Sequence, residues 1–225
     1  MSFIVGIDGP AGTGKGTITN LVAKDLKLNQ IDTGAMYRAF TLYMLDNKVE
    51  LDEIEKIKEL LEKVKIDLIQ EDDKETVFLN GKDVTKEIRS KSVTNFVSPV
   101  SSIIEVRIKM VELQRKMAEG KNVIMEGRDI TTYVFPNANV KIYLDANVEE
   151  RAKRRYKENI EKGMQTTFEE VLQDMKKRDL EKAAGISHYT INKLNHGDNV
   201  TTDVLGKICM ALNCTIDDIM EFVDE

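Results

Sequence analysis

Residues 3–17 read FIVGIDGPAGTGKGT. The β-branched apolar run at 3–8 predicts a short strand, and the apolar pattern from Lys15 to Leu26 predicts a helix. Between them lies GPAGTGKGT (9–17), which satisfies the pattern G-x-x-x-x-G-K. A strand, a glycine-rich loop and a helix in this order predict a phosphate-binding loop.

Each residue type in this loop suits an anion. Glycines let bare backbone N–H groups approach phosphate oxygens, and the N-terminus of the following helix adds positive partial charge. Lys15 adds a full positive charge toward β- and γ-phosphates, and the Thr17 hydroxyl is the candidate ligand for Mg²⁺. A glycine-rich turn without a ligand is the alternative, and Lys15 argues against a dinucleotide-binding fingerprint. The residues expected to bind ATP are Gly9, Pro10, Ala11, Gly12, Thr13, Gly14, Lys15, Gly16 and Thr17.

Composition excludes several classes of protein. The 225 residues include 41% hydrophobic residues but no apolar run long enough to span a bilayer, and the N-terminus lacks the pattern of a secretory signal. Two cysteines are too few for a disulfide framework, so we expect a cytoplasmic protein. The net charge of −6 gives no broad electrostatic footprint for nucleic acid.

Beyond the loop, strand patterns and helix patterns alternate. Apolar residues at helical spacing from Met36 to Leu45 follow a short run at 28–32 and complete a βαβα opening. The alternating segments KIDLIQ and TVFLNG flank EDDKE and predict a small antiparallel insertion. The other predicted elements are a charged helix at 51–64, an amphipathic helix at 103–118, a strand within 120–129 and a buried strand at 139–146. The pattern predicts an α/β fold, with a parallel sheet flanked by helices.

Four segments carry a resemblance to a known family. They are FIVGIDGPAGTGKGT (3–17), IDTGAMYRA (31–39), MEGRDITTYVFPNANVKIYLDA (125–146) and EERAKRR (149–155). In this order they resemble bacterial cytidylate kinases over residues 1–179. The resemblance implies a P-loop kinase with a small inserted region that binds the nucleoside monophosphate. It also implies phosphoryl transfer from ATP to CMP or dCMP with Mg²⁺, and we expect a monomer.

The resemblance also implies roles for individual residues. Ser98 and Arg107 match a serine and an arginine that read the cytosine edge, and Arg128 and Asp129 match a pair beside the acceptor phosphate. For Arg128 and Asp129, a structural ion pair at a strand end is the alternative. The expected CMP-binding residues are Thr33, Tyr37, Arg38, Ser98, Arg107 and Arg128; the expected catalytic residues are Lys15, Arg128, Asp129 and Arg178.

The charged segment EERAKRRYKENIEKG (149–163) falls where these kinases carry a closing lid. By resemblance, Arg151, Arg154, Arg155 and Arg178 supply charge to the transferring phosphoryl group, with Arg154 and Arg155 on the ATP side. A solvated helix face with spaced ion pairs is the alternative reading of the segment.

The resemblance ends within MKKRDL (175–180). Lys182 and Gly185 stand where the family has an aspartate and an arginine, so we expect an impaired kinase. Residues 180–225 instead resemble a phage-repressor-like (Xre-type) helix-turn-helix domain, with Gly185 at its turn and Ser187 capping the next helix. TFEEVLQDM is a candidate first helix for this unit, and TTDVLGKICMALNC and TIDDIMEFV predict two more helices. We therefore expect a kinase domain at 1–179 and an all-α tail at 180–225.

Two functions follow from this organisation. One is a cytidylate kinase with an altered C-terminus. The other is a nucleotide-sensing regulator whose helical tail binds DNA or protein. From Met175 onward there are six Lys and Arg against nine Asp and Glu, which favours packing or protein docking over DNA binding.

Overall fold

The computed structural model describes residues 2–71, 74–161 and 163–221. The chain divides into two compact units. The first holds residues up to Gly9 together with Thr13–Asp145, and the second holds Pro10–Gly12 together with the residues from Ala146 on. The phosphate loop is therefore divided between the two units.

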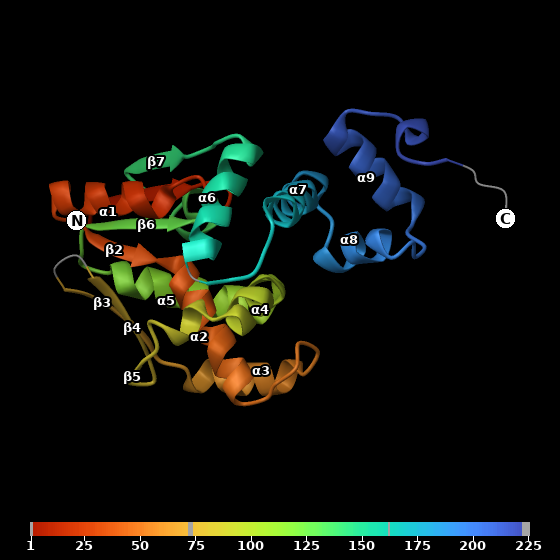
Figure 1. Cartoon of the computed structure of the whole chain (residues 1–225). Helices are drawn as coiled ribbons and strands as arrows, with labels where there is room; N and C mark the ends of the chain where they lie inside the picture. The colour runs from red at the N-terminus through yellow and green to blue at the C-terminus, as the bar shows by residue number, and fades with distance from the viewer. Residues whose placement is uncertain (1, 72–73, 162, 222–225) are drawn as a thin grey trace. The chain divides into compact units, whose positions relative to one another are not determined.

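The first unit contains a parallel sheet (Figure 1). Its strands are β1 (Ile4–Asp8), β2 (Asn29–Asp32), β6 (Val123–Gly127) and β7 (Val140–Tyr143). Their order is β2-β6-β1-β7, and every pair is parallel, with Val5 aligned with both Ile124 and Val140. This arrangement confirms the predicted α/β class.

Helices cover both faces of this sheet because neighbouring strand residues point to opposite faces. Val5, Ile7 and Ile124 pack with Ala23 of α1 (Lys15–Leu26). Val123 and Met125 lie in the larger core, which contains Met36 and Phe40 of α2 (Thr33–Asp46). The first unit also contains the helices α3 (Ile54–Lys63), α4 (Lys91–Ser102) and α5 (Ile104–Ala118), with short helical turns η1 (Glu87–Arg89) and η2 (Ile130–Val134).

The predicted insertion is confirmed as an antiparallel sheet. Strands β3 (Ile66–Glu71), β4 (Lys74–Leu79) and β5 (Lys82–Asp83) pair in this order, and Ile66 aligns with Leu79. Asn80 and Gly81 both have positive φ in the two-residue turn between β4 and β5, as tight hairpins require. Ile66, Val77 and Leu79 are buried in the larger core, so the insertion is anchored to the first unit.

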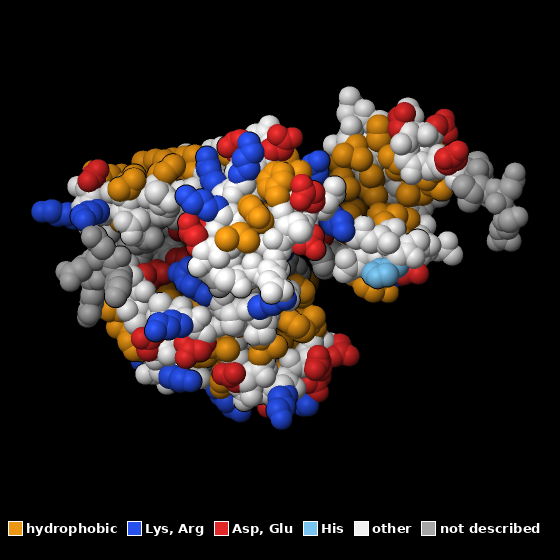
Figure 2. Space-filling model, in the orientation of Figure 1, with side chains coloured by type: hydrophobic (Ala, Val, Ile, Leu, Met, Phe, Trp, Pro, Cys, Tyr) orange, Lys and Arg blue, Asp and Glu red, His pale blue; other side chains and the backbone are white. Residues whose placement is uncertain are grey.

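The prediction that β7 is buried is wrong. Val140, Ile142 and Tyr143 are 37%, 40% and 59% exposed. Within the described sheet, β7 is an edge strand that pairs only with β1, while α1 packs on β6, β2 and β1. In Figure 2, hydrophobic side chains gather on the surface in the region of β7 and α1. The apolar sequence of β7 therefore forms an exposed edge of the sheet and not a buried strand.

The second unit is built mainly from helices. They are α6 (Val148–Glu161), α7 (Phe168–Ala184), α8 (His188–Asn195), α9 (Thr202–Leu212) and the turn η3 (Ile216–Asp218). Ala152 of α6 packs with Val171 and Met175 of α7, and the rings of Tyr156 and Phe168 meet edge to face at 6.3 Å. A capping box between Thr167 and Glu170 opens α7.

The segment MKKRDL lies inside α7. One continuous helix therefore replaces the two helices predicted on either side of this segment. The predicted turn at Gly185 (φ 62°) and the Ser187 cap, which accepts a hydrogen bond from the Thr190 N–H, are confirmed. TIDDIMEFV forms only the turn η3 and not the predicted helix, and its last residues lie outside the described ones.

Candidate active site

The phosphate loop begins where β1 ends. The buried Asp8 carboxylate accepts hydrogen bonds from the N–H groups of Ile130 and Thr131, at 2.8 and 2.7 Å, and fixes the end of the strand. Gly9 follows with φ 151°, and a Cβ atom there would lie 2.0 Å from the carbonyl oxygen of Leu144. Only glycine permits this close approach.

Lys15 lies within the loop with its ammonium turned back on the backbone. Its Nζ donates to the Gly9 carbonyl at 2.9 Å and lies 3.5 Å from the Thr13 Oγ1. Burial, and then the positive charge of Arg128, lower the pKa of Lys15 to about 8, although Glu126, Asp8 and Asp32 oppose the shift. A phosphate beside this amine would favour its charged form, because opposite charges stabilise each other where water is excluded.

Glu126 is a site residue that the sequence prediction missed. It lies near the end of β6, and its Oε1 would lie 3.2 Å from a Cβ atom on Gly16, at the start of α1. Burial, and then the charge of Asp32, raise the pKa of Glu126 to about 7. The signal was present in the sequence, since an acidic residue directly follows the apolar run VIM at the end of a parallel strand.

Arg128 lies close to the same loop. Its Nη1 donates to the Gly9 carbonyl at 2.9 Å and to the Gly127 carbonyl at 3.3 Å. Together with Lys15 it places positive charge beside Gly9, and it lowers the pKa of Lys15. The structure therefore brings Lys15 and Arg128, both predicted catalytic residues, to one place.

A second group of predicted residues gathers around Asp129. Arg107 of α5 donates from Nη2 to the Asp129 carboxylate. Burial raises the pKa of the Tyr37 hydroxyl to about 12, with the charges of Arg107 and Asp129 close to it. The alternative prediction is an ion pair between Arg128 and Asp129. The ion pair of Asp129 joins it to Arg107, whereas Arg128 donates to backbone carbonyls.

Other predicted acceptor residues make structural bonds. The buried Thr33 hydroxyl donates to the Glu126 carbonyl at 2.7 Å and joins α2 to β6. Arg38 donates from Nη1 to the Thr94 hydroxyl at 3.0 Å and so joins α2 to α4. Ser98 lies on α4, where its carbonyl accepts the Ser101 hydroxyl at 2.8 Å. Thr17 is exposed in the first turn of α1.

The predicted arginines of the second unit have different surroundings. Arg154 donates from Nη1 to the Gly12 carbonyl of the loop at 3.4 Å. Arg155 and Arg178 pair with acidic residues of their own helices, Glu158 at 3.3 Å and Asp174 at 2.8 Å. Arg151 is buried and pairs with Asp179, so the reading of this segment as a solvated face is wrong at Arg151.

A family model described as cytidylate kinase matches residues 5–202. The chain belongs to the cytidylate kinase family. The match includes both parts of the phosphate loop, the residues around Asp129 and the arginines of α6 and α7. It also continues past Leu180, where the resemblance in the sequence ended.

Individual cytidylate kinases show where the similarity extends. The cytidylate kinase of Fusobacterium nucleatum subsp. nucleatum is 47% identical over 178 residues, which are 79% of this chain and 80% of that one. The Bacillus subtilis cytidylate kinase is 47% identical over 175 residues, 78% of each chain. The Leuconostoc mesenteroides subsp. mesenteroides cytidylate kinase is 44% identical over 220 residues, 97% of this chain and 93% of that one.

The Leuconostoc kinase decides how the tail is interpreted. Because that alignment covers nearly all of both chains, residues 180–225 have a counterpart in a protein named as a cytidylate kinase. The predicted helix-turn-helix relationship of this segment gains no support from the comparisons. The tail is therefore a feature shared with another cytidylate kinase.

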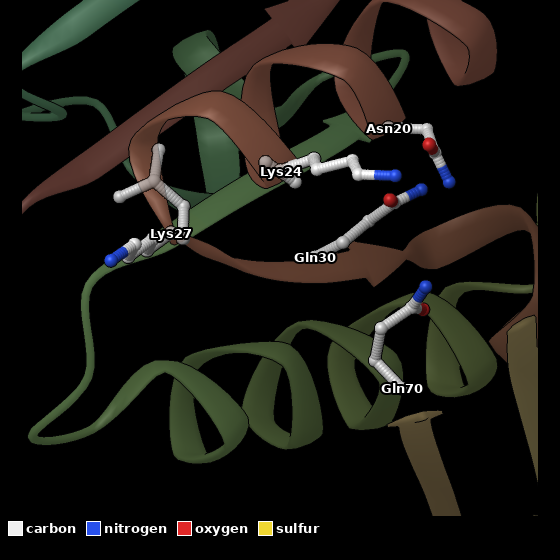
Figure 3. A pocket seen from close by; sticks show the side chains of 7 residues that line it. Asn20, Lys24, Lys27, Gln30 and Gln70 are labelled. Carbon is white, nitrogen blue, oxygen red and sulfur yellow. The ribbon is translucent and has the colours of Figure 1, made fainter. Parts of the chain in front are cut away.

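A cavity of about 370 Å³ lies elsewhere in the first unit (Figure 3). The polar ends of Asn20, Lys24, Gln30 and Gln70 lie on the same side of it, while Lys27 points away. Ala23 and Leu28 supply apolar lining. None of these residues belongs to the predicted site or to loop residues 9–17.

Proposed function

We propose that this chain transfers a phosphoryl group from ATP to CMP or dCMP, producing ADP and CDP or dCDP. The family match over residues 5–202 carries the proposal, because it includes a phosphate loop with Lys15 held inside it. All three relatives described above are named as cytidylate kinases, which favours the enzyme over a nucleotide-sensing regulator.

On the donor side, the loop residues Gly9–Thr17 bind the phosphates of ATP. Backbone N–H groups and the N-terminus of α1 face the anion, and Lys15 neutralises charge on the β- and γ-phosphates. Arg154 lies beside Gly12 and adds charge from α6, and Arg155 acts on the same side. These are the interactions that hold a triphosphate in one geometry.

The residues beside the loop fit Mg²⁺. A hard cation takes oxygen ligands, and the Thr17 hydroxyl and Glu126 carboxylate are oxygen donors on α1 and at the end of β6. When bound together with ATP, Mg²⁺ supplies positive charge that neutralises the phosphate oxygens. Glu126 must be ionised to contribute, and the cation itself favours that form.

On the acceptor side, a hydroxyl and a guanidinium suit cytosine, which presents an amine donor and a carbonyl acceptor. We assign these roles to Ser98 and Arg107, with Asp129 orienting the Arg107 guanidinium. Arg38 and Arg128 bind the acceptor phosphate, and Thr33 and Tyr37 shape the site around it. The Thr33 hydroxyl already donates to Glu126, so its contribution is to fix the start of α2.

The chemistry consists of positioning and charge stabilisation. Lys15 and Arg128 lie together beside Gly9, and Arg178 adds charge from α7 as the phosphoryl group moves. Asp129 holds Arg107 in the acceptor site. Because phosphoryl transfer needs little covalent chemistry from the protein, no separate base is required.

We further propose that residues 1–179 carry the catalytic residues and that residues 180–225 form a helical tail without a base-reading role. The acidic balance of the tail supports the absence of a base-reading role. A monomer suffices, since one chain supplies both the donor and the acceptor residues. No helix among the described residues is long and apolar enough to cross a membrane.

A coupled assay of ADP release with CMP, dCMP, UMP and AMP tests the function. Turnover with CMP and dCMP above the other two is expected, while nucleotide binding without turnover would favour the regulator. The variant Arg107→Ala tests the acceptor site and should lower the preference for CMP over UMP by about tenfold, the usual effect of losing one charge-assisted contact. Unchanged discrimination would remove Arg107 from the site.

A further inference from the structure

Arg151 is a buried arginine on the first turn of α6. Its side chain is 5% exposed, although it carries a permanent charge. Nη1 and Nη2 donate to the two carboxylate oxygens of Asp179, with Nη1 at 3.2 Å from Oδ1. Nε donates to the Ala146 carbonyl at 2.8 Å, so the guanidinium is held from two sides.

The same guanidinium contacts the phosphate loop. Nη1 of Arg151 donates to the Ala11 carbonyl at 3.5 Å. The next loop residue, Gly12, has φ 77°, and a Cβ atom on it would lie 3.0 Å from the Arg151 carbonyl oxygen. Residues 10–12 therefore lie directly against α6, within the second unit.

Asp179 brings a second helix into this arrangement. It lies in the middle of α7, whose Val171 and Met175 pack on Ala152 of α6. Beyond Asp179, α8 and α9 pack on α7, and Ala184 near the end of α7 is buried. The Asp179 carboxylate, which pairs with Arg151, therefore lies on a helix that packs against α6 and against α8 and α9.

We infer that Arg151 and Asp179 are positioning residues, which set the place of loop residues 10–12 and through them the affinity for the ATP phosphates. The inference rests on the proposed function and deepens it. A buried guanidinium is stable only when it is paired, so the position of Asp179 fixes the position of the Arg151 guanidinium. Loop residues 10–12, which contact Arg151, are then held in a matching position. Neither residue needs to touch a nucleotide.

The test compares Asp179→Asn with two matched variants. Asparagine keeps the shape of the side chain but leaves the Arg151 charge without its carboxylate. Asp179→Glu restores the charge at the same position and serves as the conservative rescue. Glu150→Gln removes the exposed Glu150–Lys153 ion pair from the same helix α6 and serves as the control.

Steady-state kinetics with each substrate varied in turn give the main readout. For Asp179→Asn we expect the KM for ATP to rise about tenfold, equivalent to about 1.4 kcal/mol, with the KM for CMP within twofold of wild type. Asp179→Glu should recover part of the affinity, and Glu150→Gln should match the wild type. All four proteins are compared at a temperature at which they are fully folded.

ATP-induced stabilisation gives a readout that is independent of turnover. At one fixed ATP concentration, tighter binding of ATP raises the melting temperature more, so Asp179→Asn should show a smaller rise than the control. Equal KM values for ATP in Asp179→Asn and Glu150→Gln, or equal losses for ATP and CMP, would overturn the positioning role. If the wild-type chain does not phosphorylate CMP while Asp179→Asn still loses ATP affinity, the proposed function fails and the positioning role stands.

Discussion

Lys15 shows how a residue at a proposed catalytic position carries a stability cost. The residue is 6% exposed, its amine donates to the Gly9 carbonyl, and the pKa of the amine is lowered to about 8. Burial disfavours the charged form of this amine, although the charges of Glu126, Asp8 and Asp32 partly offset the effect. The loop therefore holds a charge that phosphate would stabilise.

The variant Lys15→Ala should lose phosphoryl transfer while it retains the fold. We expect kcat to fall by about a thousandfold or more, because the lysine neutralises charge on the transferring group rather than filling the core. Circular dichroism and a cooperative melting transition confirm the fold, and a coupled assay measures kcat. A folded variant with wild-type kcat would exclude the phosphate-loop assignment.

Lys15 also predicts a pH dependence of stability in the ligand-free protein. Its pKa is about 8 in the fold and near the ordinary 10.5 in the unfolded chain. Between these values the unfolded chain binds more protons, so the Lys15 contribution to stability rises with pH. We compare the melting temperatures of wild type and Lys15→Met. The value for wild type minus the value for Lys15→Met should increase by about 2–4 °C between about pH 7 and about pH 9.5. Melting curves that shift in parallel would contradict the lowered pKa.

At the scale of elements, the local patterns predicted α1 to the residue and the antiparallel insertion in outline. Both depend on neighbours in sequence: a glycine loop precedes the helix, and the two strands of the pair follow each other along the chain. The pattern missed α4, which contains Pro99 and stops at the extended residue Ile103 before α5 begins. Proline disfavours a helix interior, so propensity alone argued against this element.

The β7 edge carries a prediction about aggregation. Its apolar side chains are exposed and it pairs with one strand only among the described residues. A lysine on such an edge opposes pairing with another chain, so Ile142→Lys should lower light scattering on heating and leave kcat for CMP unchanged. Leu26→Lys, on an exposed helical position of α1, is the matched control. Equal scattering in the two variants would show that the edge does not drive aggregation.

At the scale of the whole molecule, the relatives differ in how far they match the C-terminal tail, residues 180–225. The Fusobacterium nucleatum and Bacillus subtilis kinases match about four fifths of this chain, whereas the Leuconostoc mesenteroides kinase matches 97% of it. Lys182 is exposed on α7 and Gly185 caps its end, where the family resemblance implies an aspartate and an arginine. A glycine cannot supply the guanidinium, and a lysine cannot accept a hydrogen bond from a sugar hydroxyl.

A chimera tests whether this replacement impairs the enzyme. Replacing residues 180 onward with the C-terminal segment of the Bacillus subtilis kinase should raise kcat/KM for CMP by about tenfold or more, if that segment supplies the missing charge-assisted contacts. The corresponding segment of the Leuconostoc mesenteroides kinase serves as control and should leave kcat/KM unchanged. If the native chain already matches the Bacillus subtilis enzyme, Lys182 and Gly185 cause no impairment.

The sequence by itself determined the phosphate loop, the α/β class and the kinase family, because these depend on residue types at short, fixed spacings. It also indicated Gly185 and Ser187 as helix-terminating and helix-starting residues, since capping is local. Only the tertiary structure placed Glu126 against Gly16, paired Arg107 with Asp129, and buried Arg151 against Asp179. These contacts join residues between 22 and 110 positions apart, and charge pairing over such separations depends on how helices and strands pack. The exposure of β7 has the same origin, because a strand's neighbours, and not its own composition, decide whether it is covered.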